Sequence, residues 1–505
     1  MTRAVLGIDI GAGSLKTMVV DEHGRERGSA SKDFATTTPR PGWSEQNPED
    51  WWQALCDTVP RALAAAGLSA IDVDAVGFSA GAHTPVICDE NNRLLRPAIL
   101  WSDQRSAEEA RELQAAHAER ILAIALNKAS PTWTLPQLMW LNRHEPEVGQ
   151  RAKRVYVAKD WLRMRLTGDW HTDVADAVGT LLWDHGNARW SEELCGMAGW
   201  NPATLPPVVS PTTVVGSVTA EASRASGLRA GTKVICGTSD TSCESYGAGS
   251  DRAGAGVVKL ATAGTVSIVG TAPRVHPTLI NYPFAIPGLW YTISATNSCA
   301  SAHRWLRDRF FLHPSTNGSA VFAEMDALAA AAPLGAEGLL FHPYLQGERA
   351  PYWDPLLRAD FVGLTMRHER GHLVRALYEG IAMSLRDVLL EFKAQGMGMQ
   401  EARIVGGGSR SATWRQIVAD VLGVRIVLPA VTDASFGAAL LAGVAAGFFE
   451  SELKAAAHGQ ASRAVHEPDA AAERRYDDLF GLYKDTQANL SGINHRLDAF
   501  AAAGT

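Results

Sequence analysis

The chain opens with an apolar run, a group of small residues and a second apolar run. Ala4 to Ile10 has the composition of a buried strand, and Gly11 to Ser14 forms a turn before the strand-like segment Thr17 to Val20. Apolar residues then recur at helical spacing from Pro48 to Ala65, with Asn47 as the expected N-cap. The pattern predicts a glycine-tipped β-hairpin followed by a helix.

The second half of the chain repeats this arrangement. Val257 to Leu260 is an apolar strand that runs into small residues and a further strand, as Val5 to Gly13 does near the start. Val76 to His83 and Ile404 to Ser411 are likewise strands that end in small residues. Two halves built on one plan predict duplicated α/β domains.

The expected boundary between the domains follows a segment rich in Pro, Thr, Ser and Gly. Pro202 to Gly231 is interpreted as an extended connector, and we predict one domain of residues 1–245 and a second of residues 246–505. A helix around Ala470 to Asn489 has two placements, on the second domain or back on the first. Ala434 to Phe449 is too short for a bilayer span and is expected to be a tightly packed helix.

Composition agrees with a large globular protein of two domains. The chain has 505 residues, of which 46% are hydrophobic and 20% charged. The net charge is -7 and no basic block is evident, so nucleic acid is not an expected partner. The N-terminus lacks the layout of a secretory signal, and the six cysteines lack metal-ligand or disulfide spacing, which favours a cytoplasmic location.

Two acidic residues end apolar strands and are candidates for chemistry. Asp9 precedes a glycine turn whose backbone amides could approach an anion, so a phosphate and its magnesium ion would fit there, although the turn is not a P-loop. Asp240 could act as a general base toward a substrate hydroxyl. The alternatives are a plain hairpin turn with a solvated Asp9, and Asp240 as a cap of the following helix.

Other residues suit a polar small molecule. His83 follows a strand end and could hydrogen-bond a sugar hydroxyl, while Trp101 and Asp103 combine an apolar face with a carboxylate. Simple packing of His83 and core filling by Trp101 remain alternatives. Gly406 to Ser411 forms a second glycine turn that could admit a nucleotide or serve only as a tight strand-to-helix turn.

Taken together and in their order, these stretches resemble the FGGY carbohydrate kinases over nearly the whole chain, and within that family the xylulose kinases. The matching stretches are Gly7 to Gly13 (GIDIGAG), Gly42 to Gln46 (GWSEQ) with Trp51 and Trp52, Arg96 to Arg105 (RPAILWSDQR), Ala158 to Gly168 (AKDWLRMRLTG), Pro343 to Pro351 (PYLQGERAP) and Gly406 to Ser411 (GGGSRS).

The resemblance implies two actin-like, ribonuclease H-like domains with ATP and Mg²⁺ in a cleft between them. It implies that the domain of residues 1–245 binds the sugar and carries the first phosphate turn, and that residues 246–505 bind the nucleotide. Asp240 would be the catalytic base, and Asp9 with Asp240 would hold the metal. The implied nucleotide contacts are Gly11, Ala12, Gly13, Ser14, Lys16, Gly264, Thr265, Gly407, Gly408 and Ser411.

For the sugar, the resemblance implies contacts from Ala82, His83, Asp240 and Thr241, in addition to Trp101 and Asp103. Ala82 stands at a position where the xylulose kinases of this comparison carry Met, and Thr241 at a position where they often carry Asn. The expected reaction is phosphorylation of D-xylulose to D-xylulose 5-phosphate, with ribulose, L-xylulose, glycerol or gluconate as alternative substrates. A sugar, ATP and a second copy of the chain are the expected partners, and a membrane is not.

Two other classes of function stay open. An actin-like ATPase or regulatory module would bind nucleotide and a protein partner, and the motif Gly7 to Gly13 alone agrees with it. A silent sugar-binding relative would bind without turnover. His83, Trp101 and Asp103 argue against the first alternative, and the presence of Asp240 and both phosphate turns argues against the second.

Overall fold

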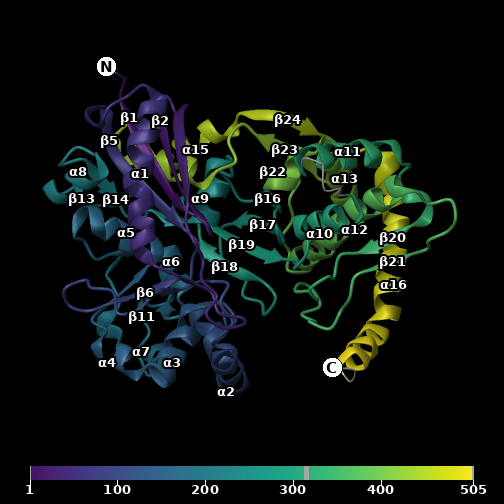
Figure 1. The fold of residues 1–505 in the computed structure, drawn as a ribbon, viewed down its shortest axis with the longest axis horizontal. Helices are drawn as coiled ribbons and strands as arrows, with labels where there is room; N and C mark the ends of the chain where they lie inside the picture. The colour runs from purple at the N-terminus through teal and green to yellow at the C-terminus, as the bar shows by residue number, and fades with distance from the viewer. Residues whose placement is uncertain (1, 312–317, 503–505) are drawn as a thin grey trace. The chain divides into compact units, whose positions relative to one another are not determined.

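The structure is a computed structural model that describes residues 2–311 and 318–502. The chain forms two compact units, whose strands and helices can be followed by their labels in Figure 1. The first unit comprises Met1–Asp251, Thr271–Tyr291 and Val431–Gln460. The second comprises Arg252–Gly270, Thr292–Ala430 and Ala461–Thr505.

The first unit is built on a mixed sheet in the order β13-β14-β5-β1-β2-β3, with β15 also paired to β5. β1 is antiparallel to β2 and parallel to β5, as the predicted hairpin and following strand require. The strands are β1 (Ala4–Ile10), β2 (Ser14–Asp21), β3 (Glu26–Asp33), β5 (Val73–Ala80), β13 (Val214–Ser217), β14 (Lys233–Ile235) and β15 (Thr238–Ser239).

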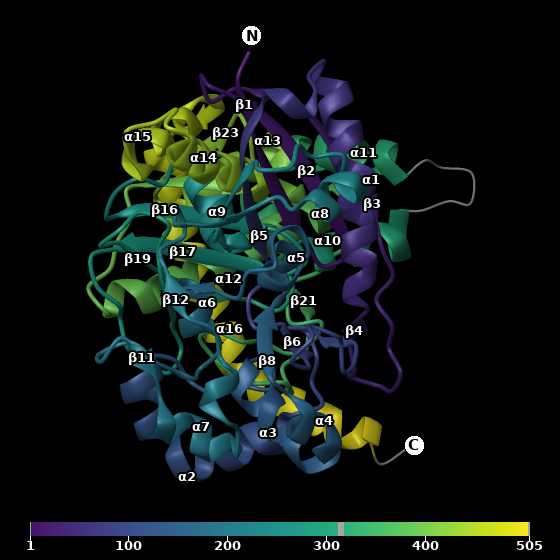
Figure 2. The ribbon, with the colours of Figure 1, turned by 90° about the vertical axis from the view of Figure 1, so that its left-hand side faces the viewer.

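Helices cover both faces of this sheet. α1 (Pro48–Ala66) begins at the predicted cap, where the Asn47 side chain accepts a hydrogen bond from the Glu49 amide, and its Trp51 shares a core with Leu6 and Ile8 of β1. α14 (Ala434–Ala446) contacts β1 on the face of the sheet where Gly7 lies. Leu6 and Ile8, the neighbours of Gly7 in the strand, face the opposite side, because successive residues of a strand alternate between the two faces. Figure 2 shows α1 and α14 on either side of the strands.

Glycines allow α14 to approach the sheet closely. A Cβ atom on Gly7 would lie 1.8 Å from the carbonyl oxygen of Ser435, and one on Gly77 would lie 2.2 Å from that of Ala438. Backbone therefore packs directly on backbone at both positions. The apolar stretch Ala434 to Phe449, expected to be a tightly packed helix, contains α14, which packs on the sheet in this way.

The second unit contains a sheet in the order β19-β17-β16-β22-β23-β24. β16 is antiparallel to β17 and parallel to β22, so it repeats the arrangement of β1, β2 and β5. The strands are β16 (Ala255–Leu260), β17 (Gly264–Gly270), β19 (Trp290–Ala295), β22 (Glu401–Val405), β23 (Arg425–Pro429) and β24 (Ser462–His466). The predicted duplication is confirmed strand by strand.

The helices of the second unit include α12 (Arg370–Ala394), α13 (Ala412–Leu422) and the long α16 (Ala470–Ala502). Tyr483 of α16 accepts a hydrogen bond from His342 through its carbonyl oxygen, and Lys484 pairs with Asp387 at 2.7 Å. α16 therefore belongs to the second unit.

The predicted domain boundary differs from the observed units. Residues 271–291 and 431–460 belong to the first unit, whereas the prediction placed them in a domain of residues 246–505. For residues 431–460 the reason is the close packing of α14 on β1, a contact that joins residues more than 400 positions apart. Residues 271–291 are joined to the first unit through Asn281, whose amide donates to Asn127 at 2.7 Å. The predicted connector Pro202 to Gly231 also carries regular structure, namely the edge strand β13 and α8 (Ala220–Ser226).

The remaining elements complete the two units. They are β4 (Glu45–Gln46), β6 (Pro85–Cys88), β7 (Ala98–Ile99), α2 (Ala107–Ala125), α3 (Thr134–His144), α4 (Pro146–Arg151), β8 (Arg154–Val157), α5 (Ala158–Thr167), β9 (Thr172–Asp173), α6 (Val174–Gly179), β10 (Trp183–Asp184), β11 (Arg189–Trp190), α7 (Glu192–Ala198), β12 (Val208–Val209), α9 (Asp240–Gly247), β18 (Ile280–Pro283), α10 (Ala300–Leu306), α11 (Gly318–Ala331), β20 (Leu340–His342), β21 (Asp360–Val362) and α15 (Glu452–Ala456). Within the described ranges, none of the helices has the length and hydropathy of a bilayer span.

Candidate active site

The turn between β1 and β2 leaves backbone amides open to solvent. The Gly11 amide donates to the Ser14 carbonyl oxygen at 2.9 Å and closes the turn, while Ala12 and Gly13 are exposed. No atom lies within 4 Å of the position that a Cβ on Gly13 would take. The space beside the turn is open, and an anion held against its backbone stays a prediction.

Asp9 is the second-last residue of β1 and lies beside this turn. The Ser79 hydroxyl donates to its Oδ1 atom at 2.7 Å. Burial raises the pKa of Asp9 well above its ordinary value, and the negative charges of Asp240, Asp433 and Glu244 raise it further. The carboxylates repel one another, so a bound cation would relieve the site.

Lys16 lies opposite Asp9 in the β1–β2 pairing, but its ammonium group pairs with Asp433 at 2.7 Å. Asp433 also caps α14, where it accepts from the Ser435 amide at 2.9 Å. If Lys16 contacts the nucleotide as predicted, its ammonium group is shared between the nucleotide and Asp433.

Asp240 is the first residue of α9 and is half-buried. Its Oδ1 atom accepts from the Thr241 amide at 2.6 Å and from the Thr241 hydroxyl at 3.2 Å. Its Oδ2 atom lies 3.9 Å from the position of a Cβ on Gly81. One oxygen is thus bonded to Thr241 in the first turn of α9, whose N-cap is Ser239 and not Asp240, while the other is directed to the strand end that precedes His83.

His83 is held by aromatic residues that the sequence did not single out. Its backbone has φ 67°, its ring stacks on Trp133 at 4.0 Å between centroids, and its Nε2 atom shares a 2.6 Å hydrogen bond with the Tyr282 hydroxyl. Burial lowers the pKa of His83 to about 3, against a backbone hydrogen bond with Thr132 that acts in the opposite direction. The ring is therefore a neutral hydrogen-bonding group.

Trp101 and Asp103 have different surroundings although they are neighbours in sequence. The Trp101 side chain is 45% exposed and lies against Gly81, whose Cβ would be 3.2 Å from the indole Cδ1 atom. Asp103 is fully buried and accepts from the Ser44 amide and from the backbone and guanidinium of Arg105. Trp101 can meet a ligand, whereas the Asp103 carboxylate is occupied by protein donors.

The second unit carries its own small-residue turns. Gly264, at the start of β17, donates its amide to the Thr296 hydroxyl at 3.2 Å, and Thr265 follows it half-buried. Gly407 is exposed, and a Cβ on Gly408 would lie 2.8 Å from Trp414. The phosphate and nucleotide contacts expected at these positions stay predictions.

Ser411 has a structural task in this turn. Its hydroxyl accepts from the Trp414 amide at 2.9 Å as the N-cap of α13 and also hydrogen-bonds Asp326. A nucleotide contact from Ser411 would therefore use a hydroxyl that already has protein partners.

Comparisons with known proteins identify the chain. The profile of the FGGY family of carbohydrate kinases matches through its N-terminal domain at residues 4–247 and through its C-terminal domain at residues 257–446. The chain belongs to the FGGY family of carbohydrate kinases. As an FGGY kinase it phosphorylates a sugar with ATP.

Similar proteins cover nearly the whole FGGY chain. The xylulose kinase of Bacillus subtilis is 31% identical over 98% of this chain and 99% of its own. The crystal structure of xylulose kinase from Rhodospirillum rubrum is 30% identical, covers 98% of this chain and 100% of its own, and superimposes with a TM-score of 0.88. Bacillus subtilis gluconokinase is 28% identical over 89% of both chains.

The acidic residues of this FGGY kinase fit a magnesium ion. Within residues 2–311 and 318–502, no group of three or more His, Cys, Asp or Glu side chains could enclose a metal by itself. Mg²⁺ is usually bound through one or two carboxylates together with waters and substrate phosphates, so it does not need such a group. Asp9 and Asp240, whose charges repel, are the predicted donor pair for such an ion.

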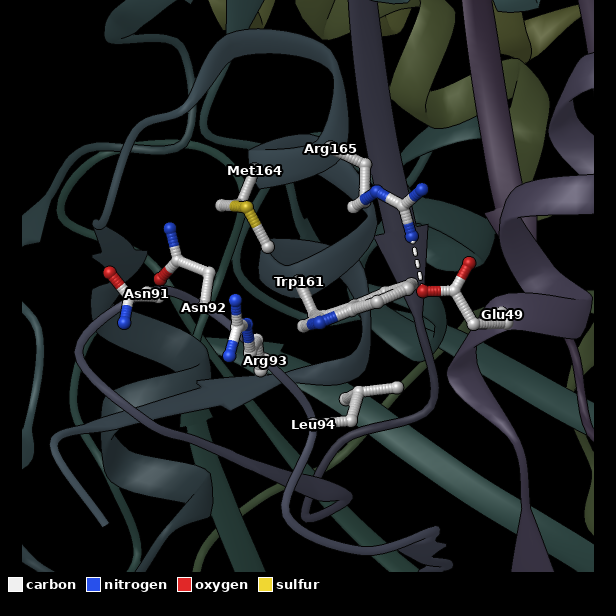
Figure 3. Close-up of a pocket in the computed structure, with 8 residues that line it drawn as sticks. All are labelled: Glu49, Asn91, Asn92, Arg93, Leu94, Trp161, Met164 and Arg165. Atoms are coloured by element: carbon white, nitrogen blue, oxygen red, sulfur yellow. Dashed lines mark hydrogen bonds and ion pairs between the residues drawn. The ribbon is translucent and has the colours of Figure 1, made fainter. Parts of the chain in front are cut away.

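A surface hollow of about 470 Å³ also lies in the first unit (Figure 3). It is lined by Glu49, Asn91, Asn92, Arg93, Leu94, Trp161, Met164 and Arg165. The Arg165 guanidinium pairs with Glu49 and lies over the Trp161 ring, with its carbon 5.2 Å from the ring centroid. The hollow contains none of the predicted site residues, and we do not assign the sugar to it.

Proposed function

We propose that this FGGY kinase transfers the terminal phosphoryl group of ATP to a primary hydroxyl of D-xylulose, with Asp240 as the general base. The observation that carries the proposal is the placement of the Asp240 carboxylate. One oxygen is fixed by the Thr241 amide, and the other is directed to Gly81, where Trp101 is half exposed. A sugar on the Trp101 face would meet an oriented carboxylate.

In the reaction the sugar hydroxyl oxygen bonds to the terminal phosphorus while the bond from that phosphorus to ADP breaks. Asp240 accepts the hydroxyl proton as the oxygen attacks. Because the Thr241 amide holds Oδ1, the carboxylate cannot rotate freely away from the sugar. Orientation of this kind reduces the entropy that the step must lose.

Asp9 and Asp240 are the residues that would hold Mg²⁺, which when bound neutralises charge on the phosphates. The exposed amides of Ala12 and Gly13 would receive phosphate oxygens in the first unit. In the second unit we assign the nucleotide to the turns at Gly264 and Gly407. This division extends our prediction that the sugar is bound by the N-terminal domain and the nucleotide by the C-terminal domain.

The identity of the sugar depends on a few contacts. We assign sugar contacts to Ala82, His83, Trp101 and Thr241, and we leave out Asp103 because its oxygens are already bonded to protein donors. The similarity to xylulose kinases favours D-xylulose. Ala82 and Thr241 are the two positions at which another substrate would be accommodated.

The test is ADP release by the purified enzyme with ATP and Mg²⁺ in the presence of D-xylulose, D-ribulose, L-ribulose, L-xylulose, glycerol or gluconate. A kcat/KM for D-xylulose at least about tenfold above the others is expected, since single contacts discriminate by about 1 to 3 kcal/mol. A clear preference for another compound would refute D-xylulose and direct attention to Ala82 and Thr241. ADP release without any sugar would favour an ATPase.

Asp240→Asn tests the base. The expected result is a fall in kcat of at least about two orders of magnitude with ATP binding nearly unchanged, because Asn keeps the shape of the side chain but cannot accept the proton. Nucleotide affinity is measured separately by titration calorimetry. An Asp240→Asn enzyme with full kcat would remove Asp240 from the role of base.

A further inference from the structure

A group of buried charged side chains lies next to the segment that leads to Asp240. The ammonium group of Lys159, on α5, is fully buried and lies 2.6 to 3.0 Å from three carboxylates. The three residues are Asp160, Asp173 and Asp176, and all are buried. Replacing such a cluster with apolar side chains of similar volume is often neutral or stabilising. The cluster is therefore not explained by stability alone, and we consider which segments it holds in place.

The cluster fixes the chain before Asp240 at two points. The Thr238 hydroxyl, fully buried, donates to Asp173 Oδ2 at 2.7 Å. Two residues earlier, the Cys236 carbonyl oxygen accepts from the guanidinium of Arg163 at 2.7 Å, and Arg163 is itself paired with Asp160. A charged partner strengthens both hydrogen bonds, and burial excludes competing water.

The residue between these points is fixed by the backbone. Gly237 has φ 76°, and a Cβ on it would lie 2.1 Å from the carbonyl oxygen of Phe78. Thr238 and Ser239 then pair with β5, opposite Ser79 and Ala80. The path of the chain into Asp240 is therefore set by β5 on one side and by the charged cluster on the other.

Asp173 also orients the residues around His83. It is the N-cap of α6, where its Oδ2 atom accepts from the Ala175 amide at 3.1 Å. The last residue of α6 is Gly179, and a Cβ there would lie 3.2 Å from His83 and 3.6 Å from Tyr282. The same carboxylate thus holds both the segment before Asp240 and the helix that supports the His83–Tyr282 pair.

We propose that Asp173, held in place by Lys159, is a positioning residue that fixes the Asp240 carboxylate through Thr238. The proposal rests on the proposed role of Asp240 as the general base. A small displacement of a reacting group can cost about a hundredfold in rate, so loss of the Thr238 hydrogen bond lowers kcat although Thr238 touches no substrate. Nucleotide binding, which we assign to the turns at Gly264 and Gly407, changes less.

The experiment compares Thr238→Val with Thr238→Ser in the full-length enzyme. Valine matches the shape of threonine but cannot donate to Asp173, whereas serine restores the hydroxyl. The expected result is a kcat for Thr238→Val lower by about tenfold to a hundredfold, with the KM for ATP within about twofold of the wild type. Thr238→Ser is expected to recover kcat to within about threefold.

Thr232→Val is the matched control. Thr232 is also buried and precedes β14 in the same unit, but its hydroxyl has no hydrogen-bond partner among the residues that the structure describes. The kcat of Thr232→Val should equal that of the wild type. Thermal unfolding of each variant shows whether that variant is folded at the assay temperature. If Thr238→Val does not fold, Thr238→Ala replaces it, with the same expected loss and the same rescue by serine.

Three results would overturn the proposal: a wild-type kcat for Thr238→Val, a Thr238→Ser enzyme as slow as Thr238→Val, or an equal loss in Thr232→Val. Asp240→Asn, measured in parallel, keeps the two proposals distinguishable. An active Asp240→Asn would refute the base. An inactive Asp240→Asn together with a fully active Thr238→Val would refute only the positioning role.

Discussion

The contact between α14 and β1 predicts that Gly7→Ala destabilises the first unit. Gly7 lies in the middle of β1, and its backbone faces the first turn of α14. A Cβ there would lie 1.8 Å from the Ser435 carbonyl oxygen and 2.6 Å from the Ala439 amide nitrogen, whereas real Cβ atoms keep at least about 3.0 Å. Helix or strand must therefore move by more than 1 Å.

The magnitude follows from the kind of obstacle. Overpacking in a core typically costs about 1 to 3 kcal/mol, and the lower values apply where a flexible side chain can move aside. Here both obstacles are helix backbone, so we expect a loss of about 3 kcal/mol or more in the free energy of unfolding. For a unit of this size each kcal/mol corresponds to about 2 °C, which gives a fall in the unfolding midpoint of about 6 °C.

Gly13→Ala is the matched control from the same hairpin. Nothing lies within 4 Å of its Cβ position, and its backbone is outside the left-handed region, so alanine is expected to leave the midpoint unchanged or slightly raised. Its effect should fall on the KM for ATP instead, because the added methyl group stands on the proposed phosphate turn. Thermal unfolding followed by circular dichroism, together with ADP release, separates the two effects.

The reasoning is refuted if Gly7→Ala unfolds within about 1 °C of the wild type. It is also refuted if Gly13→Ala loses as much stability as Gly7→Ala, because the loss would then reflect removal of glycine from the hairpin rather than the approach of α14. A Gly7→Ala enzyme with a lowered midpoint and nearly normal kinetics at low temperature is the expected outcome.

Three further predictions concern buried titratable groups. Burial raises the pKa of Glu348 from 4.5 to about 7, so the native state binds this proton more tightly than the unfolded state, and stability falls as pH rises from about 4.5 to 7. In Glu348→Gln the free energy of unfolding should decrease less with rising pH, by up to about 3 kcal/mol. Unfolding midpoints of both proteins between pH 5 and 8 measure the difference. Because His83 stays neutral above a pKa of about 3, His83→Gln should raise the sugar KM without altering the pH profile of kcat/KM between pH 5 and 9. Asp103→Asn should cost about 3 kcal/mol by breaking its buried pair with Arg105, with little change in the sugar KM of the folded enzyme; a raised KM at unchanged stability would contradict this.

Much of the sheet framework could be predicted from local patterns. Ala4–Ile10 is a strand with the predicted bounds, and β16 and β22 follow the apolar runs that suggested a repeat. These elements are predictable because alternation and apolar runs are properties of neighbouring residues. The edge strand β13 was missed because its residues are only partly buried and lie among turn-forming residues.

The site was less predictable because its parts come from distant segments. The Asp9 turn and Asp240 could be found because glycine and acid stand at strand ends. Trp133 and Tyr282 could not, since neither has a local signal and they meet His83 only in the folded unit. For Asp103 the sequence context beside Trp101 suggests a ligand contact, whereas the fold shows that Arg105 and Ser44 donate to its oxygens, which no local pattern indicates.

The buried cluster and the acidic site illustrate two uses of charge in one unit. Around Asp9 the carboxylates repel and its pKa is raised, so this place gains from a cation that arrives with the substrate. Around Lys159 three buried carboxylates are paired with two buried cations of the protein itself, and the groups are fixed before any ligand binds. Thr238 links the two, because its hydroxyl is bonded to the fixed cluster and Asp240 follows two residues later. A rigid support whose charges are paired within the protein, next to an electrostatically incomplete site, suits preorganised phosphoryl transfer, since positions must be set in advance while charge is completed by the nucleotide and its metal.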